Sequence, residues 1–336
     1  PYLQLGAGRQ SLAPLEQIRA RFGWRRDGTD DLLPWYATGE FHLSDLTWRW
    51  NGETVPGFDL RFQPGPGATA VIADRFPVGP VRGLLRGLGV FSERISRALD
   101  NYRPSGTLNR LLLRLPGDDS GNFRLTADLR NMEVQAHGGA PSAKGLNGTL
   151  LVTRAGGLVQ ADSPALTVGF PRLFEGLWDV RNFTADVAWR LEDGLIRVFS
   201  SDMAMDFGPS ARLTGAFDLS LGAETEDQLG LRVSLADGNA GMLADLVPVK
   251  LVKPGLYNWL TTAIKEADIV SGRYFGHGQI GSGSPPGSFV SSMVYDFENS
   301  TVEYDKRWPE VTAAAGRVFI HQGQTRIDLD SGQTGG

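Results

Sequence analysis

Apolar and polar residues alternate with a period of two along most of the chain. In residues 123–130, Phe, Leu, Ala and Leu alternate with Arg, Thr, Asp and Arg, and many later stretches repeat this pattern. Such strands are typical of antiparallel sheets, in which one face packs and the other face meets water. A shift in the phase of the alternation near Asp45 predicts a β-bulge there. The pattern therefore predicts a mainly β protein.

The chain also repeats one supersecondary unit. Shifting the sequence by 168 residues aligns residues 131–163 with residues 299–331 without a gap, and the proline and glycine in each copy separate apolar alternations. This order predicts a strand, a proline-bearing loop, a strand, a tight polar turn and a third strand. The identical pairs are Asn131 and Asn299, Val134 and Val302, Pro141 and Pro309, Gly148 and Gly316, Asp162 and Asp330, and Ser163 and Ser331.

Three segments have helical rather than strand spacing. Residues 11–22 carry apolar residues three or four apart and predict a short helix. Residues 80–102 form one apolar stripe and predict an amphipathic helix, either packed on the sheet, acting as a movable lid, or lying on a membrane surface. Residues 239–267 predict two short helices, the first capped by Asn239 and the second running from Pro254 through Ile264.

These helices are too few to cover about twenty strands, so the apolar face must be covered in another way. We expect a long, curled antiparallel β-sheet that forms an elongated groove, with a few short amphipathic helices. The expected organisation is one continuous rod rather than separate globular domains. Its parts are N-terminal strands with a short helix (1–77), a helical insertion (78–104), β-groove modules (105–238), a second helical insertion (239–271) and a last β-groove module (272–336).

Composition excludes several functions. The 43 glycines and 19 prolines suit many short strands joined by turns, and the net charge of -5 without any basic run argues against nucleic acid as a partner. The absence of cysteine excludes disulfides, thiolate metal sites and a cysteine nucleophile. No apolar run is long enough for a membrane span and no signal peptide opens the chain, so we expect a segment of a longer protein.

Catalytic and metal-binding motifs give no support for an enzyme. Residues 276–281 read Gly-His-Gly-Gln-Ile-Gly and match a dinucleotide fingerprint by letters, but they lie in an alternating strand without a following helix. The four histidines are scattered, and Asp328 and Asp330 lack the later glutamate of a calcium loop. We therefore predict no catalytic residue, no metal and no cofactor.

Several phrases in the chain resemble the central region of the YhdP family, a group of AsmA-like, TamB-related, bridge-like lipid transfer proteins. The resemblance is specific over residues 129–332 and looser before them. The phrases are Gly145 to Gly148, Phe170 to Phe174, Val187 to Trp189, Leu246 to Pro248, Trp259-Leu260, Gly272 to Gly281, Gly287 to Phe289, Val302 to Tyr304 and Trp308-Pro309.

This resemblance implies a function in lipid transport. Members of the family are anchored in the inner membrane of Gram-negative bacteria, cross the periplasm and are implicated in moving phospholipid to the outer membrane along an apolar β-groove. The expected partners are therefore phospholipid acyl chains, with both membranes contacted through parts of the protein outside this chain. The family supplies no catalytic residues.

The alternation supplies the candidate groove lining, because the resemblance implies no particular lipid contacts. A structural spacer or interaction scaffold, in which the same side chains fill the sheet's own core, remains the alternative. The candidate lipid-binding residues are Leu111, Leu113, Phe123, Leu125, Leu129, Phe183, Val187, Trp189, Phe217, Leu219, Leu231, Val233, Met293, Tyr295, Val318, Ile320, Ile327 and Leu329.

Overall fold

The computed structural model describes most of the chain and divides it into two compact units. Unit 1 comprises residues 1–137 and 142–159, and unit 2 comprises residues 138–141 and 160–336. The described residues are 2–3, 6–7, 10–11, 15–26, 39–50, 52–65, 67–87, 93–117, 121–192, 194–222, 226–250, 254–281, 283–303, 305, 307–322 and 324–334.

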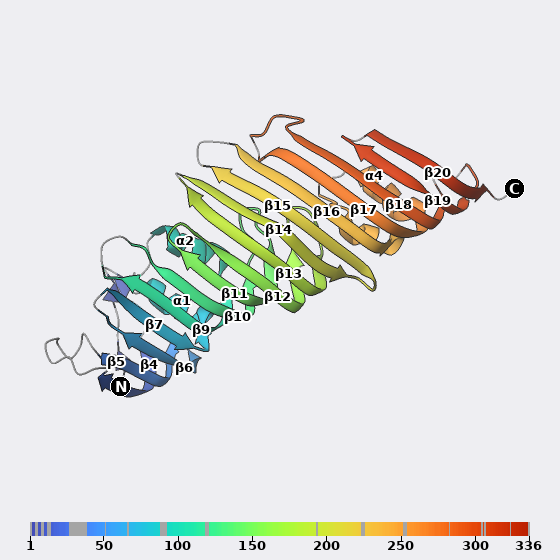
Figure 1. Ribbon diagram of the computed structural model, residues 1–336. Helices are drawn as coiled ribbons and strands as arrows, with labels where there is room; N and C mark the ends of the chain where they lie inside the picture. Colours follow the sequence, from blue (N-terminus) through green and yellow to red (C-terminus); the bar gives the residue numbers. More distant parts are fainter. Residues whose placement is uncertain are drawn as a thin grey trace. The chain divides into compact units, whose positions relative to one another are not determined.

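Unit 1 is an antiparallel sheet with two helices (Figure 1). Its pairings run β1-β4-β5-β6-β7-β9-β10-β11, with the short β8 also beside β9. A separate ribbon joins β2 to β3. The elements are β1 (Tyr2–Leu3), β2 (Gly6–Ala7), β3 (Gln10–Ser11), β4 (Leu15–Arg26), β5 (Gly39–Trp50), β6 (Glu53–Gln63), β7 (Ala68–Asp74), β8 (Phe76–Pro77), α1 (Val78–Gly87), α2 (Glu93–Tyr102), β9 (Ser105–Pro116), β10 (Arg124–Val134) and β11 (Ser142–Thr153).

Unit 2 is built in the same way, and from β13 to β20 each strand pairs antiparallel with the next one in sequence. Strand β12 (Gly156–Gly169) begins in unit 1 and continues into unit 2. The other elements are β13 (Leu177–Glu192), β14 (Leu195–Phe207), β15 (Ala211–Gly222), β16 (Asp227–Asn239), the 3-10 helix η2 (Ala240–Met242), α3 (Leu243–Leu246), α4 (Pro254–Ala263), β17 (Ile264–Ile280), β18 (Phe289–Val302), β19 (Val311–His321) and β20 (Gln324–Thr334).

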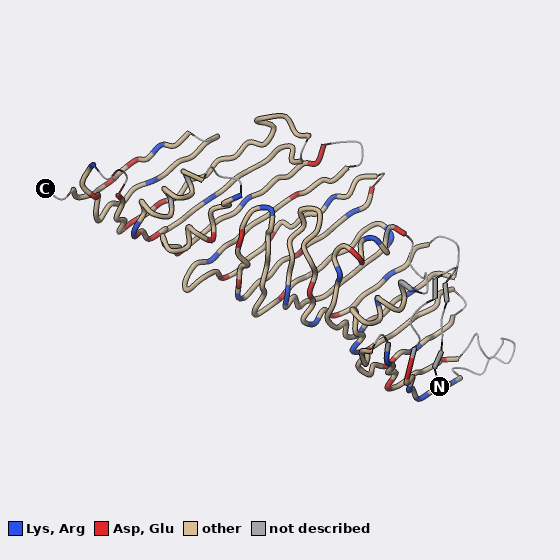
Figure 2. The backbone as a smooth tube through the Cα atoms, turned by 180° about the vertical axis from the view of Figure 1, so that it is seen from behind, with Lys and Arg blue, Asp and Glu red and all other residues tan. Residues whose placement is uncertain are grey.

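This architecture confirms the predicted fold class. The described chain is mainly β, its strands pair antiparallel and mostly with their sequence neighbours, and no described pairing closes the sheet of either unit into a barrel. The helices lie behind the strands in Figure 1 and in front of them in Figure 2, so each unit carries its helices on one face of its sheet.

β-Bulges bend the strands, and they occur at residues in the left-handed conformation. Asp45 has φ 51°, and the register of β5 with β6 shifts between Leu43 and Leu46, which confirms the predicted bulge. In unit 1 an acid or amide side chain on the neighbouring strand accepts the bulged N–H, which fixes the bend. These hydrogen bonds join Asp45 N to Asp59 Oδ1 at 2.9 Å, Arg110 N to Asp74 Oδ1 at 3.1 Å, and Asn131 N to Asn147 Oδ1 at 3.0 Å.

The repeat predicted from the sequence has the expected elements in both copies. The first is β10, a loop with Pro141, β11, a two-residue turn and β12, and the second is β18, a loop with Pro309, β19, a turn and β20. The repeated asparagines Asn131 and Asn299 are bulge residues with φ of 47° and 51°. Their identity is explained by conformation, because asparagine tolerates left-handed backbone better than most residues.

The helix predicted for residues 11–22 is wrong. Residues 15–22 belong to β4, which pairs with β5, and residues 12–14 lie outside the described part. Gln17 has φ 52°, and the register shifts between Glu16 and Arg19 and again between Arg19 and Arg21. Each bulge adds a residue, so apolar positions normally two apart become three or four apart and imitate a helix.

The other helical segments were located correctly, but three details differ. The stripe predicted as one helix over residues 80–102 belongs to α1 and α2, and residues 88–92 lie outside the described part. Asn239 ends β16 and makes no capping hydrogen bond with its side chain, so the predicted cap is wrong. Ile264 begins β17 rather than continuing α4.

Candidate functional site

One face of the unit 1 sheet is apolar, and we call it the inner face of unit 1. Residues directly opposite each other in an antiparallel pair point to the same side of the sheet. The registers therefore place Leu43, Leu60, Ala73, Leu111, Ala127 and Leu150 in one transverse row across six strands, from β5 to β11. The neighbouring row holds Phe41, Phe62, Val71, Leu113, Leu125 and Val152.

Helix α1 covers one end of this face, which we call the covered end. Val81, Leu84 and Leu85 of α1 pack against Trp48 and Phe58. Trp48 is 5% exposed and Phe58 is 2% exposed, and their rings meet edge to face with centroids 5.7 Å apart. The α1 half of the predicted apolar stripe is thus buried on the inner face.

The α2 half of the stripe is not buried in this way. Ile95 is 47% exposed and Tyr102 is 37% exposed. The helix is held instead by hydrogen bonds, including one from Arg82 Nη1 to the Leu99 carbonyl oxygen at 2.8 Å. Of the two helices described in unit 1, α1 is thus the one whose apolar side chains are buried on the inner face.

The other end of the unit 1 inner face is open to solvent. Phe62 lies on it directly opposite Phe41, yet it is 41% exposed. Leu115 shares the face with Leu113 and is also exposed. The inner face of unit 1 thus passes from a buried core under α1 to an accessible apolar surface.

Unit 2 shows the same gradation. At its covered end, the buried side chains of Ala267, Ile269, Phe297, Ala314 and Val318 form one cluster. Ala240 of η2 packs against this cluster, and Trp178 Nε1 donates to the Asp245 carbonyl oxygen of α3 at 3.2 Å. Aromatic contacts among Phe170, Phe174, Trp178 and Phe207 complete this end.

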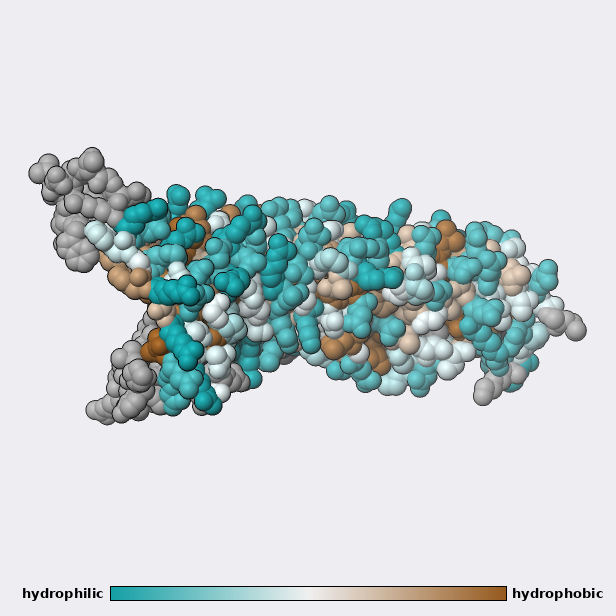
Figure 3. Space-filling model, turned by 90° about the horizontal axis from the view of Figure 1, so that it is seen from below, coloured by the Kyte–Doolittle hydropathy of each residue, from teal (hydrophilic) through white to brown (hydrophobic). Residues whose placement is uncertain are grey.

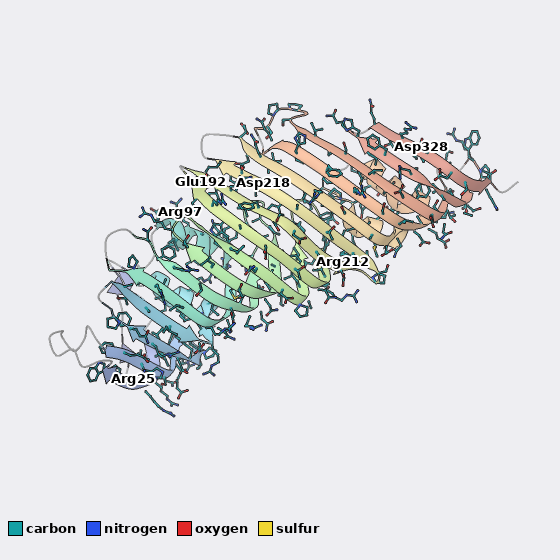
Figure 4. The ribbon with its side chains drawn as sticks, viewed as in Figure 1. Arg25, Arg97, Glu192, Arg212, Asp218 and Asp328 are labelled. Carbon is teal, nitrogen blue, oxygen red and sulfur yellow. The ribbon has the colours of Figure 1, made fainter. Side chains whose placement is uncertain are left out.

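At the open end of unit 2 the inner face is only half-buried. The registers place Trp189, Val198, Leu219 and Leu229 in one transverse row, and none of these side chains is fully buried. Glu192 and Asp218 mark this end in Figure 4, and Arg212 marks the opposite end. Large apolar side chains that remain accessible in a folded unit indicate a binding surface when they are contiguous.

The outer face carries ion pairs between neighbouring strands. Arg110 Nε donates to Asp128 Oδ2 at 2.7 Å, and Arg317 Nε donates to Asp296 Oδ1 at 2.7 Å. The hydrogen bond from Arg317 lowers the pKa of the Asp296 carboxyl below its ordinary value. Figure 3 shows one side of the molecule on which hydrophilic residues predominate around smaller hydrophobic patches. The outer face thus carries the charged pairs, although Phe199, Phe275 and Phe319 also lie on it.

The registers place the candidate lining residues of the strands on the inner faces. Phe183 and Val187 lie at register shifts of β13 and share the alternation of Ala185 and Trp189. Phe123 lies just before β10, outside any strand. Ile327 and Leu329 share the face of Val318 but are exposed on β20. Contact of these residues with lipid stays a prediction.

Two parts of this surface were not predicted from the sequence. The predicted lining begins at Leu111, although Phe58, Leu60 and Phe62 alternate clearly and lie on the inner face. The hydroxyl side chains of Tyr274 and Ser291 lie on the inner face of β17 and β18 and were not predicted there either. The available signal was the presence of tyrosine and serine at inner positions of an otherwise apolar alternation.

The described residues contain no group of three or more histidine, cysteine, aspartate or glutamate side chains placed to hold a metal ion. None of the described helices has the length and apolar character needed to cross a membrane. The Gly276 to Gly281 stretch lies in β17 and the hairpin turn that follows, as expected of a strand rather than a phosphate loop.

Each unit is thus an open antiparallel sheet whose apolar inner face is partly covered by helices and whose outer face carries ion pairs. The family profile described as YhdP protein matches residues 3–336 of the chain. The chain therefore belongs to the YhdP family, which confirms the resemblance found in the sequence. Comparison with curated proteins and with solved structures gave no match.

Proposed function

We propose that this chain is a periplasmic segment of a protein that carries phospholipid between the inner and outer membranes, with acyl chains held on the inner faces of its sheets. The observation that carries the proposal is the accessible apolar surface at the open ends, where Phe62 and Leu115 are exposed in unit 1. Membership of the YhdP family supports the same function.

Hydrophobic transfer is sufficient to hold a lipid on such a surface. Burial of each methylene group contributes about 0.8 kcal/mol, so an acyl chain leaves a bilayer readily only where the apolar contact is almost continuous. The transverse apolar rows within each unit provide this continuity. Headgroups remain in water at the open end, and no catalytic step forms part of the proposal.

A structural spacer is the alternative, and one observation favours it locally. At the covered ends the inner face is filled by the protein's own side chains, such as Val81 against Trp48 and Phe58. There the sheet has a conventional core and leaves no room for an acyl chain. The lipid-carrying role is therefore assigned to the open ends only.

Native mass spectrometry of the purified chain tests the proposal. We expect the chain, isolated from Gram-negative cells without detergent, to retain phospholipid, and solvent extraction to yield lipid in amounts comparable to the protein. The apolar contact predicts a mixture of acyl-chain lengths, because bulk burial does not select one length. A chain that carries no lipid, and takes up none from added vesicles, would support the spacer instead.

A further inference from the structure

Tyr274, Ser291 and Tyr295 place hydroxyl groups on the inner face of β17 and β18, between the open end and the buried cluster. Tyr274 of β17 pairs with Met293, and Gly276 pairs with Ser291 of β18. Gly272 pairs with Tyr295, which places that side chain on the same face. The adjoining strand β16 presents only apolar side chains at the corresponding positions, which are Leu231, Val233 and Leu235.

Glycine in β17 makes room for the first two hydroxyls. A Cβ atom at Gly276 would lie 2.8 Å from Tyr274 Oη and 2.7 Å from Phe289 Cζ, so both rings reach over this residue. Tyr274 Oη therefore lies over Gly276, and Ser291 stands directly opposite Gly276 on β18. Ser291 is two residues from Phe289, the first residue of β18, or about 7 Å from the open end of the strand.

The third hydroxyl lies closer to the covered end. Tyr295 packs against the buried cluster that contains Phe297 and Val318. Burial raises the pKa of Tyr295, and burial likewise raises the pKa of Tyr274 against the opposing effect of Ser291. Both tyrosines are thus neutral donors at physiological pH.

The surroundings select the kind of acceptor that these donors can bind. The arginines of the neighbouring strands, Arg232 and Arg273, alternate with inner-face residues and lie on the outer face. An anionic carboxylate or phosphate on the inner face would lack a counter-ion, and burial of an unpaired charge is costly. A neutral carbonyl oxygen costs less free energy to remove from water, and here it can accept a hydrogen bond from a hydroxyl group.

We propose that Tyr274, Ser291 and Tyr295 form a polar step that binds the ester carbonyl groups of a diacyl glycerolipid. This inference rests on the proposed function, since it assumes that acyl chains occupy the inner face. In a lipid, the ester group lies between the polar headgroup and the apolar chain. Ser291 likewise lies between the open end of β18, which meets water, and the buried apolar cluster. The headgroup then extends to the open end, and the acyl chains lie along the transverse apolar rows of β14 to β16, because the covered end is filled by side chains.

A competition between ester and ether lipids tests the polar step. The full chain is incubated with vesicles that contain equal amounts of a diacyl phosphatidylcholine and its dialkyl ether analogue, matched in chain length, and bound lipid is counted by native mass spectrometry. We expect the diacyl lipid to be recovered about threefold to tenfold more, the ratio that one or two net hydrogen bonds produce. Equal recovery of the two lipids would overturn the polar step and leave the proposed function intact.

Matched variants assign the preference to these residues. The double substitution Tyr274→Phe with Tyr295→Phe keeps the rings, and we expect it to bring the recovery ratio close to one through loss of the diacyl lipid. Ser291→Ala should lower the ratio partly. Tyr257→Phe is the control, because the Tyr257 hydroxyl of α4 donates to the Ala244 carbonyl oxygen of α3 and is not part of the polar step. An unchanged ratio in the double variant would also overturn the assignment. Failure of the unsubstituted chain to bind either lipid would instead contradict the proposed function itself.

Discussion

Aspartate at Val187, Phe217 and Leu231 together is expected to reduce bound lipid by at least about tenfold. Phe217 pairs with Leu231, and Val187 lies on β13 at nearly the same level, so the three residues form a transverse row on the inner face of unit 2. Loss of contact with only two methylene groups costs about 1.6 kcal/mol, which already exceeds a factor of ten. Extraction and quantification of lipid from the purified variant measures the effect.

A matched triple variant on the outer face controls for folding and for added charge. Thr184, Thr214 and Ser234 lie in a transverse row of the same strands but face outward, and Thr214 pairs directly with Ser234 as Phe217 pairs with Leu231. Aspartate at these three positions adds the same charge in the same spacing. We expect normal lipid recovery, and an equal loss in both triple variants would attribute the effect to charge or unfolding rather than to the apolar path.

Replacement of Phe58 by alanine is expected to lower the local free energy of unfolding of unit 1 by about 3 to 5 kcal/mol, the usual cost of deleting a buried aromatic side chain. Phe58 is 2% exposed and contacts the rings of Trp48 and Phe76 beneath α1. Hydrogen exchange of the β5 and β6 amides, followed by mass spectrometry, reports this local stability.

Phe62 is the control for this prediction because it lies on the same strand and the same face. Its side chain is 41% exposed and meets Phe41 with ring centroids 6.4 Å apart. Phe62→Ala should cost only about 1 kcal/mol, as expected for one partly exposed aromatic contact. If both substitutions cost the same, the open end is packed as tightly as the covered end, and the distinction between them is wrong.

The sequence predicted those parts of the fold that depend on side-chain polarity alone. Alternation identified the antiparallel strands and placed residues such as Leu125, Leu219 and Leu231 on the apolar face. Repetition of Asn131 at Asn299 identified the repeated unit, and its physical reason is a bulge that requires left-handed backbone. These features are local, so a single sequence is sufficient to reveal them.

Features that depend on bulges or on distant packing were not predictable. The bulge at Gln17 converts strand spacing into apparent helical spacing, which produced the wrong helix in residues 11–22. No local pattern distinguishes Phe58 under α1 from Phe62 in the open half, because the helix that separates them comes later in the chain. The polar step likewise depends on the register that brings Ser291 opposite Gly276.

Site-specific photo-crosslinking in cells tests the central claim most directly. A crosslinker at Val187 or Leu231 would lie on the inner face of unit 2, whereas one at Asp186 or Arg232 would lie on the outer face of the same strands. If acyl chains occupy the inner face, phospholipid is captured at Val187 and Leu231 and not at Asp186 and Arg232. Equal capture on both faces, or capture on neither, would contradict the lipid-carrying function and leave the structural spacer.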